Sequence, residues 1–279
     1  MAARRTVRGA STSEFTRGLR WATAAAVTIV GLLGLAVVRA DNDTSVSCSG
    51  TPEDCYSADL QKLITDCIAA NMANPPAGNP GPFTRGYSSI VVLGGQCFAG
   101  GFAGLTRICH NIVVGSAATK DKQSTTAGYP NDRMLWWDAV VKEIKKDPTK
   151  PIKDILDAVD AADPDPDAMT PAPSTSNGGA GVVMGDPGGP TPGKSFHAVL
   201  FAGVVPAPRA RASHPNSRYN VAYNAAINDM KKTLTDDLKV PAGNVMTKIG
   251  GTYADLQAMI TATWSKMNDN EQFILGFAD

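Results

Sequence analysis

The chain has 279 residues, enough for one large domain or two small ones. Lys+Arg and Asp+Glu both number 26, and this balance argues against a nucleic-acid-binding protein, which normally carries a basic excess. A hydrophobic fraction of 43% with 19% charged residues is typical of a globular protein and excludes wholesale disorder.

Residues 1–40 have the features of an export signal. Arginines precede residues 21–38, which carry no charge, and Val38 and Ala40 are small residues at the spacing of a cleavage site. We expect a signal peptide cleaved near Ala40, and an uncleaved membrane anchor stays open because eighteen apolar residues can just span a bilayer. Either way we expect the rest of the chain outside the cytoplasm, secreted or periplasmic, with residues 41–56 as a flexible segment.

Residues 57–162 alternate between helical and strand patterns. Ser57 is the expected N-cap of the first helix, and Trp136, Trp137, Val140 and Ile144 are expected to face inward from the second. The continuous apolar, β-branched runs are typical of strands buried on both faces. The expected elements are helices at residues 57–72, 132–144 and 152–161 and strands at residues 90–93 and 112–115.

Residues 163–193 break this pattern. Fourteen of these 31 residues are Pro or Gly, and large apolar side chains are scarce. Such a composition cannot bury enough apolar area to offset the entropy of ordering the chain. The segment is therefore predicted to be a linker or long surface loop, poorly ordered near residues 171–181.

Residues 194–279 return to alternating strands and helices. The strands are predicted to be buried, and the helix at residues 219–238 to be amphipathic. Strands alternating with helices along the whole chain predict an α/β fold with a mainly parallel sheet. The expected elements are strands at residues 198–202, 245–247 and 273–277 and helices at residues 219–238 and 253–267.

Cys97 is the candidate nucleophile. It follows the predicted strand at residues 90–93 in a glycine-rich turn, and active groups of parallel sheets gather beyond the carboxyl ends of the strands. The backbone amides of Gly95 and Gln96 are placed to bind a carbonyl oxygen, and a helix starting near Phe98 would lower the pKa of the thiol. A small buried thiol in a tight turn is the alternative from position alone.

The segment SSIVVLGGQCFAGGFAGLTRICHNIVVGSAA at residues 88–118 resembles the nucleophile strand of caspase-like cysteine peptidases, which include legumains and metacaspases. Residues 196–279, from FHAVLFAG to QFILGFAD, resemble the opening half of the same fold. The resemblance implies a three-layer caspase-like α/β fold, with residues 57–162 as its Cys-bearing half and residues 194–279 as its opening half. It also implies a peptide or protein substrate.

The chain departs from this family in two ways. The two halves occur in inverted order, as in a circular permutation, with residues 163–193 joining them. The family continues after its FAD-like strand with the catalytic His, whereas this chain stops at Asp279. By the family's strand order, we expect the strand at residues 273–277 beside the strand at residues 90–93, which would bring Asp279 to the same sheet edge as Cys97.

Another histidine would have to replace the missing base. His110 precedes a predicted strand and His197 begins one. Both are therefore expected at the amino end of the sheet, away from Cys97. His214 follows the strand at residues 198–202, on the correct side, and is the candidate base. The resemblance also implies that Arg218 or His214 lines the pocket for the substrate residue before the scissile bond.

Four further cysteines accompany Cys97. We expect Cys48 to pair with Cys55, and Cys67 to be either a buried thiol or the partner of Cys109. No His or Cys cluster has the spacing of zinc ligands, and the glycines near Cys97 form no nucleotide-binding motif, so we expect neither a metal nor a cofactor.

Two functions of different class follow. The first is an exported cysteine peptidase with Cys97 as nucleophile. The second is a non-catalytic protein of the same fold that binds or scaffolds, or an incomplete gene product, because the general base is missing.

Overall fold

The computed structural model describes residues 52–73, 86–95, 99–107, 110–119, 133–162, 164, 170–189, 191, 194–203 and 217–278. All of them belong to one compact unit that spans Gly50–Asp279. The predicted export signal and residues 41–51 of the predicted flexible segment lie outside the described residues, so for them the predictions stay predictions. The flexible segment was expected to reach residue 56, and this was wrong, because residues 52–56 already belong to a helix.

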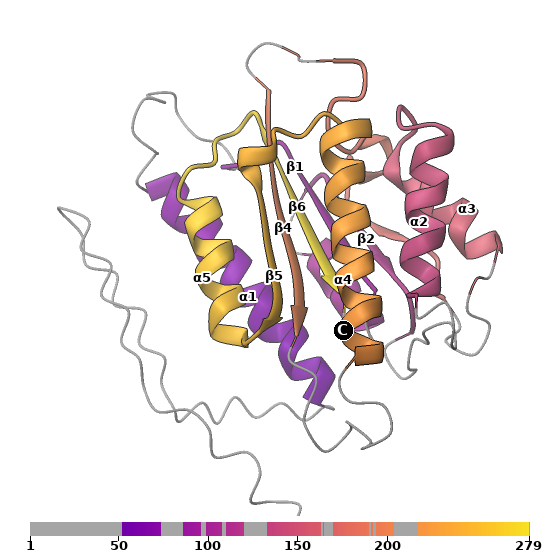
Figure 1. The fold of residues 1–279 in the computed structure, drawn as a ribbon. Coiled ribbons are helices and arrows are strands. Elements are labelled where there is room, and N and C mark those ends of the chain that lie inside the picture. The colour runs from indigo at the N-terminus through magenta and orange to yellow at the C-terminus, as the bar shows by residue number, and fades with distance from the viewer. Residues whose placement is uncertain are drawn as a thin grey trace, which may run out of the picture. The chain divides into compact units, whose positions relative to one another are not determined.

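A six-stranded mixed sheet forms the centre of this unit, and β6 lies between β1 and β4 (Figure 1). Its spatial order is β3-β2-β1-β6-β4-β5, and every neighbouring pair is parallel except β2 and β3. The α/β class and the mainly parallel sheet are therefore confirmed. The strands are β1 (Ser89–Gly94), β2 (Ile112–Ser116), β3 (Ser174–Thr175), β4 (Ser195–Gly203), β5 (Val245–Gly251) and β6 (Glu271–Ala278).

All five strands predicted from apolar runs are present, and four of them are buried as expected. The fifth prediction was wrong about burial, because β5 lies at the edge of the sheet and exposes Met246 and Thr247. The apolar run at residues 245–247 is so short that its sequence pattern is the same for an edge strand and for a central strand.

Each predicted α-helix exists, with different ends. Ser57 lies inside the first helix and does not cap it, since the helix begins at Pro52. In place of the single helix predicted at residues 219–238, an α-helix ends at Lys232 and a π-helical segment follows it directly, over Thr233–Asp237. The helices are α1 (Pro52–Ala73), α2 (Leu135–Lys146), α3 (Ile152–Ala162), α4 (Ser217–Lys232) and α5 (Tyr253–Trp264), with shorter turns η1 (Ala99–Arg107), η2 (Gly179–Gly181), η4 (Thr233–Asp237) and η5 (Ala242–Asn244).

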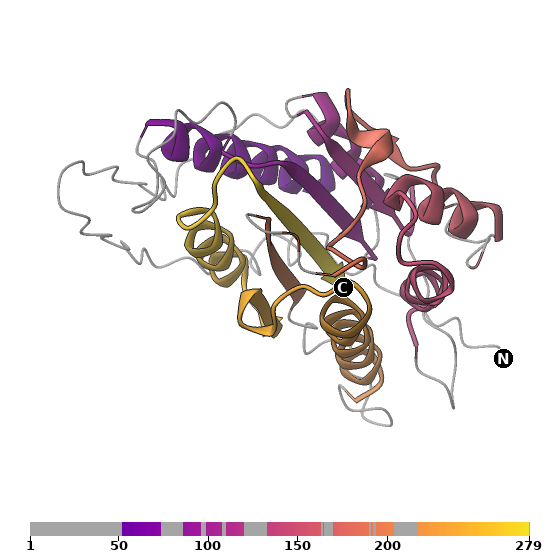
Figure 2. The same ribbon diagram turned by 90° about the horizontal axis from the view of Figure 1, so that it is seen from above.

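Helices cover both faces of the sheet, as the view from above shows (Figure 2). Side chains alternate along β1, so Val91 and Leu93 pack toward α2, α3 and α4, while Ile90 and Val92 pack toward α1, η1 and α5. Trp136, Trp137, Val140 and Ile144 are all buried on the first of these faces, as predicted. Two separate apolar cores therefore hold the sheet in place.

The segment at residues 170–189, called the strap below, has more order than its composition predicts. It is mostly loop, as expected, but the expectation of poor order near residues 171–181 was wrong. Strand β3 pairs with β2, and the Asn111 N–H donates to the Asn177 carbonyl at 3.0 Å. Backbone groups of the strap form hydrogen bonds with the edge of the sheet there, so the strap is held in place with few buried apolar side chains.

Gln272 fastens the other end of the strap to the start of β6. Its side-chain amide donates to Ser89 Oγ at 2.8 Å and to the Val183 carbonyl at 2.9 Å, and its carbonyl accepts the Gly185 N–H at 2.8 Å. The side chain is almost fully buried. One residue thus joins β6, β1 and the strap.

Within the part of the chain that the structure describes, no helix has both the length and the apolar character needed to cross a bilayer.

Candidate functional site

The carboxyl ends of β1 and β6 lie side by side. The two strands are parallel neighbours, with Ile90 opposite Phe273 and Gly94 opposite Phe277. This confirms the expected adjacency of the two strands. Cys97 and Asp279, which follow these strand ends along the chain, lie outside the described residues, as does Gln96, so their approach stays a prediction.

The carbonyl oxygen of Phe277 accepts two hydrogen bonds at this edge. One comes from the Gly95 N–H at 2.9 Å and the other from Trp137 Nε1 at 3.0 Å. The amide of Gly95 was expected to bind an oxyanion, and this expectation was wrong, because that N–H extends the pairing of β1 with β6 by one residue. A substrate oxygen would have to find its donors further along the turn.

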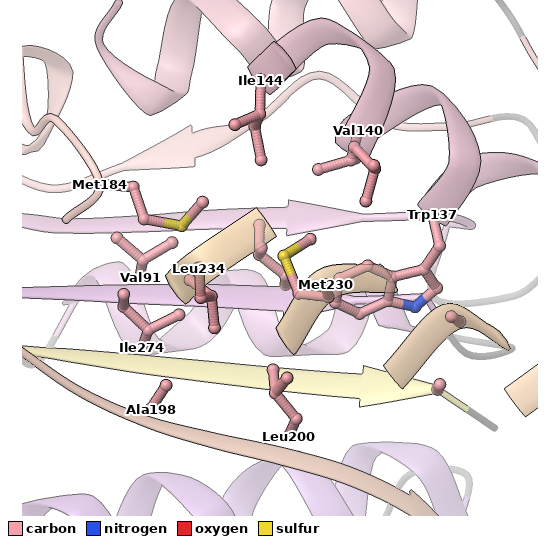
Figure 3. Close-up of a cluster of buried hydrophobic side chains, with 14 of the residues drawn as sticks. Val91, Trp137, Val140, Ile144, Met184, Ala198, Leu200, Met230, Leu234 and Ile274 are labelled. Atoms are coloured by element: carbon pink, nitrogen blue, oxygen red, sulfur yellow. The ribbon is translucent and has the colours of Figure 1, made fainter. Parts of the chain in front are cut away.

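Trp137 covers the strand ends from the side of α2, and Figure 3 shows its indole among the buried side chains of that core. A Cβ on Gly95 would overlap the indole ring, and one on Gly276 would lie 3.0 Å from it. The indole is almost fully buried. The sequence predicts that Trp137 faces inward, but it does not predict this contact with two glycines from strands far apart in the chain.

The other face of the same strand end is covered by η1. The rings of Phe102 and Phe277 stack at 5.1 Å with 27° between their planes. The Gly100 N–H donates to the Ala118 carbonyl at 2.9 Å, which ties η1 to the end of β2. The helical segment predicted after Cys97 is therefore present, as a 3₁₀ helix. The end of β6 is held between Trp137 and Phe102.

The described histidines lie at the opposite, amino edge of the sheet. His110 is exposed just before β2, and its backbone N–H donates to Tyr87 Oη at 3.2 Å. His197 is buried near the start of β4, with Nε2 3.5 Å from Glu271 Oε1. Both positions agree with the sequence analysis. His214 lies outside the described residues, and Arg218 is described only as part of the α4 backbone.

A charged cluster links α2 to α4 close to Trp137, and the sequence analysis did not identify it. Arg133 donates from Nε to Asp138 Oδ2 at 2.9 Å, and Nη2 also bonds Asp229. The hydrogen bond to Asp138 raises the pKa of Arg133, so the guanidinium stays charged at all working pH values. All three side chains are more than a third exposed, so the cluster contributes little to stability.

Cys67 is a free thiol on the buried face of α1. This confirms the first of the two alternatives for that residue. Burial, and then the charge of Asp66, raises the pKa of the thiol to about 11. The side chains of Cys48, Cys55 and Cys109 lie outside the described residues, so the Cys48–Cys55 pair stays a prediction.

A cavity of about 500 Å³ opens at the amino edge, between the strap and the starts of β1, β4 and β6. Lys194 and Asp186 are its charged residues, and Ser89 and Gln272 are buried polar residues of its wall. Among the described residues, no three side chains of His, Cys, Asp or Glu gather closely enough to hold a metal ion.

No protein-family model matches the chain, and neither a curated protein nor a solved structure matches it.

Proposed function

We propose that the chain is an exported homologue of caspase-like cysteine peptidases, built on their three-layer fold, with Cys97 as the nucleophile for peptide-bond hydrolysis. One observation carries the proposal. Strands β1 and β6 are parallel neighbours at the centre of the sheet, with Gly94 level with Phe277. In the family that the sequence resembles, the strands that lead to the catalytic Cys and His are neighbours in the same way.

The chemistry begins with the thiol of Cys97. Its sulfur attacks the peptide carbonyl carbon, the amine leaves with a proton from the base, and water then releases the acid from the thioester. The oxyanion would bind to amides that follow Gly95, starting with Gln96, because the Gly95 N–H bonds Phe277.

The proton acceptor in this proposal is His214. His110 and His197 lie at the amino edge of the sheet, whereas His214 belongs to the segment that follows the carboxyl end of β4. Arg218, in the first turn of α4, and His214 would line the pocket for the residue before the scissile bond. An arginine there would select substrates with an acidic or hydrogen-bond-accepting side chain.

Peptide turnover and selective labelling test this proposal. Full-length protein is incubated with a library of short peptides and, separately, with a peptide-like thiol reagent. We expect Cys97 to label and Cys97→Ala to abolish both signals. Cys67→Ala is the matched control and should change neither, because the Cys67 thiol is buried and has a raised pKa. Turnover that survives Cys97→Ala would refute the proposal.

A non-catalytic peptide-binding protein is the second candidate. It is favoured by the Gly95 amide, which bonds Phe277, and by the place of His110 and His197 at the far edge. Peptides that bind with unchanged affinity to wild type and Cys97→Ala, without cleavage, would establish it.

Export is part of the proposal and has its own test. Expression in a bacterial host that secretes proteins should yield a mature chain that begins at Asp41, as read by N-terminal sequencing. A full-length chain that stays in the membrane fraction would establish the anchor instead.

A further inference from the structure

We propose that the outer edge of β5 is a docking site for an extended peptide of another protein, which pairs with β5 as an antiparallel strand and carries an acidic and an apolar residue separated by one position. The inference is independent of the proposed peptidase activity. Among the described strands, β5 pairs with β4 alone, and α5 lies beside it (Figure 1). An edge strand of this kind presents a row of unpaired backbone N–H and C=O groups.

A surface pocket of about 370 Å³ lies between this edge and α5. Met246 and Met259 contribute to its apolar lining, and Met246 Sδ lies 3.4 Å from Thr263 Oγ1, which places the Met246 side chain on the α5 side of the strand. Apart from Met246, which is 37% exposed, only two large apolar side chains of the described residues are exposed. Methionine side chains adapt to ligands of different shape, so the pocket suits one apolar side chain of a docked strand.

Lys248 adds a positive charge to the wall of the pocket. Its Nζ lies 3.7 Å from Asp255 Oδ1, and both side chains are more than a third exposed. The Asp255 carboxylate is already engaged at the start of α5, where it accepts the Thr252 N–H at 2.7 Å and the Thr252 hydroxyl at 2.9 Å. An ammonium group has three donors, so Lys248 can also bind an acidic group of the docked strand.

The spacing of Met246 and Lys248 determines the order of residues in the peptide. Side chains alternate along a strand, so these two residues lie on the same face of the sheet. In an antiparallel pair, the residue opposite Lys248 precedes the residue opposite Met246 by two positions. An acidic residue at the first position would pair with the ammonium, and an apolar residue at the second would enter the pocket.

A second copy of this chain fits the edge less well than an acidic peptide. Strand β5 contains no acidic residue, so pairing of β5 with itself would set Lys248 opposite another lysine or an uncharged residue. Like charges on facing strands are destabilising, and a lysine on an edge strand opposes such pairing. Charge complementarity therefore favours a strand from a different protein.

Fluorescence anisotropy of labelled peptides tests the proposal on the full-length chain with Cys97→Ala, which prevents cleavage of the probe. The probe has about eight residues, enough for one strand, with Glu-Val-Leu at its centre. We expect saturable binding below about 1 mM, and binding about tenfold weaker when the central order is reversed to Leu-Val-Glu. Equal affinity for the two orders, or no binding of either peptide, would overturn the proposal.

N-methylation of the peptide separates strand pairing from apolar contact alone. In a peptide paired along one side, alternate N–H groups face β5 and the others face solvent. Methyl groups on one alternate set of amides should abolish binding, and methyl groups on the other set should leave the affinity within about twofold. Equal effects of the two sets would rule out pairing with β5. This comparison alters only the peptide, so it does not depend on the folding of a variant.

Substitutions in the protein locate the site. Met246→Lys should weaken binding about tenfold, whereas Met72→Lys, which changes an exposed methionine on α1, should leave it unchanged. Lys248→Glu should lose the Glu-Val-Leu probe and bind Lys-Val-Leu instead, whereas Lys232→Glu, at an exposed position on α4, should change neither affinity. Equal effects within either pair of variants would contradict the site.

Sedimentation of the same chain without peptide tests the other occupant. We expect a monomer whose sedimentation does not change on Met246→Lys. A dimer that Met246→Lys converts to monomers would show that the edge binds a second copy, and it would overturn the proposal.

Discussion

Glycine at position 95 is required by its neighbour rather than by its backbone angles. The Trp137 ring occupies the space where any side chain would begin. We expect Gly95→Ala to lower the free energy of unfolding by about 1–3 kcal/mol, the usual cost of overfilling a packed core. Denaturation in urea measures this loss.

Gly188→Ala is the control for this substitution, because a Cβ there would meet nothing within 4 Å. We expect its free energy of unfolding to stay within about 0.5 kcal/mol of wild type, as for other surface changes. Equal losses at both positions would contradict the account of Gly95.

Cys67 makes stability depend on pH. Burial raises the pKa of its thiol from 9.0 to about 11, so the folded state holds the proton more tightly than the unfolded state. The stabilisation is complete below pH 9.0 and is lost as the pH rises toward 11. Urea denaturation from pH 8 to 11 should show a steeper decline for wild type than for Cys67→Ala, and parallel curves would contradict the assignment.

At the scale of single elements, α5 depends on its first turn. Thr252 and Asp255 form a reciprocal cap: the Asp255 N–H donates to Thr252 Oγ1, and the Thr252 N–H donates to the Asp255 carboxylate at 2.7 Å. Thr252→Ala should cost about 1 kcal/mol of unfolding free energy. Thr252→Ser keeps the hydroxyl and should cost less than half as much in the same denaturation assay.

The strands were predictable because their side chains carry the signal. Continuous apolar runs at residues 90–93 and 273–277 indicate burial on both faces, and the structure has them at the centre of the sheet. The run at residues 245–247 is too short to distinguish an edge from a centre. The strap was missed because its order comes from backbone groups that pair with β2, and composition does not record those.

The candidate site was predictable only in part, and for a related reason. The resemblance indicated that β6 lies beside β1, and it does. The bond between Gly95 and Phe277, and the ring of Trp137 above it, depend on the register between segments far apart in the chain. The sequence carries two signals of this contact. Gly95 and Gly276 are small residues near the ends of the two strands, and Trp137 is predicted to face inward from a helix elsewhere in the chain.

At the scale of the whole molecule, Gln272 links the starts of β1 and β6 to the strap. Its buried side-chain amide forms hydrogen bonds with Ser89, Val183 and Gly185. We expect Gln272→Leu to lower the free energy of unfolding by about 2–4 kcal/mol, because it leaves more than one buried polar group without a partner. Limited proteolysis should also begin within the strap, at residues 182–189.

Gln257→Leu is the comparison for Gln272→Leu, since Gln257 is only half-buried on α5. We expect it to leave both the unfolding free energy and the cleavage pattern close to wild type. If Gln272→Leu is equally mild, the strap is held by its apolar contacts and not by the amide.

The position of β6 also determines when the molecule can fold during synthesis. It follows every other described element along the chain, yet it fills the middle of the sheet, and Gln272 bonds a residue 183 positions earlier. A ribosome adds about 5–20 residues per second, so β1 waits roughly ten seconds or longer for its central neighbour. Throughout that time β1 and β4 each have an unpaired edge, and such edges bind other strands readily. The nascent chain is therefore a natural client for chaperones until β6 emerges.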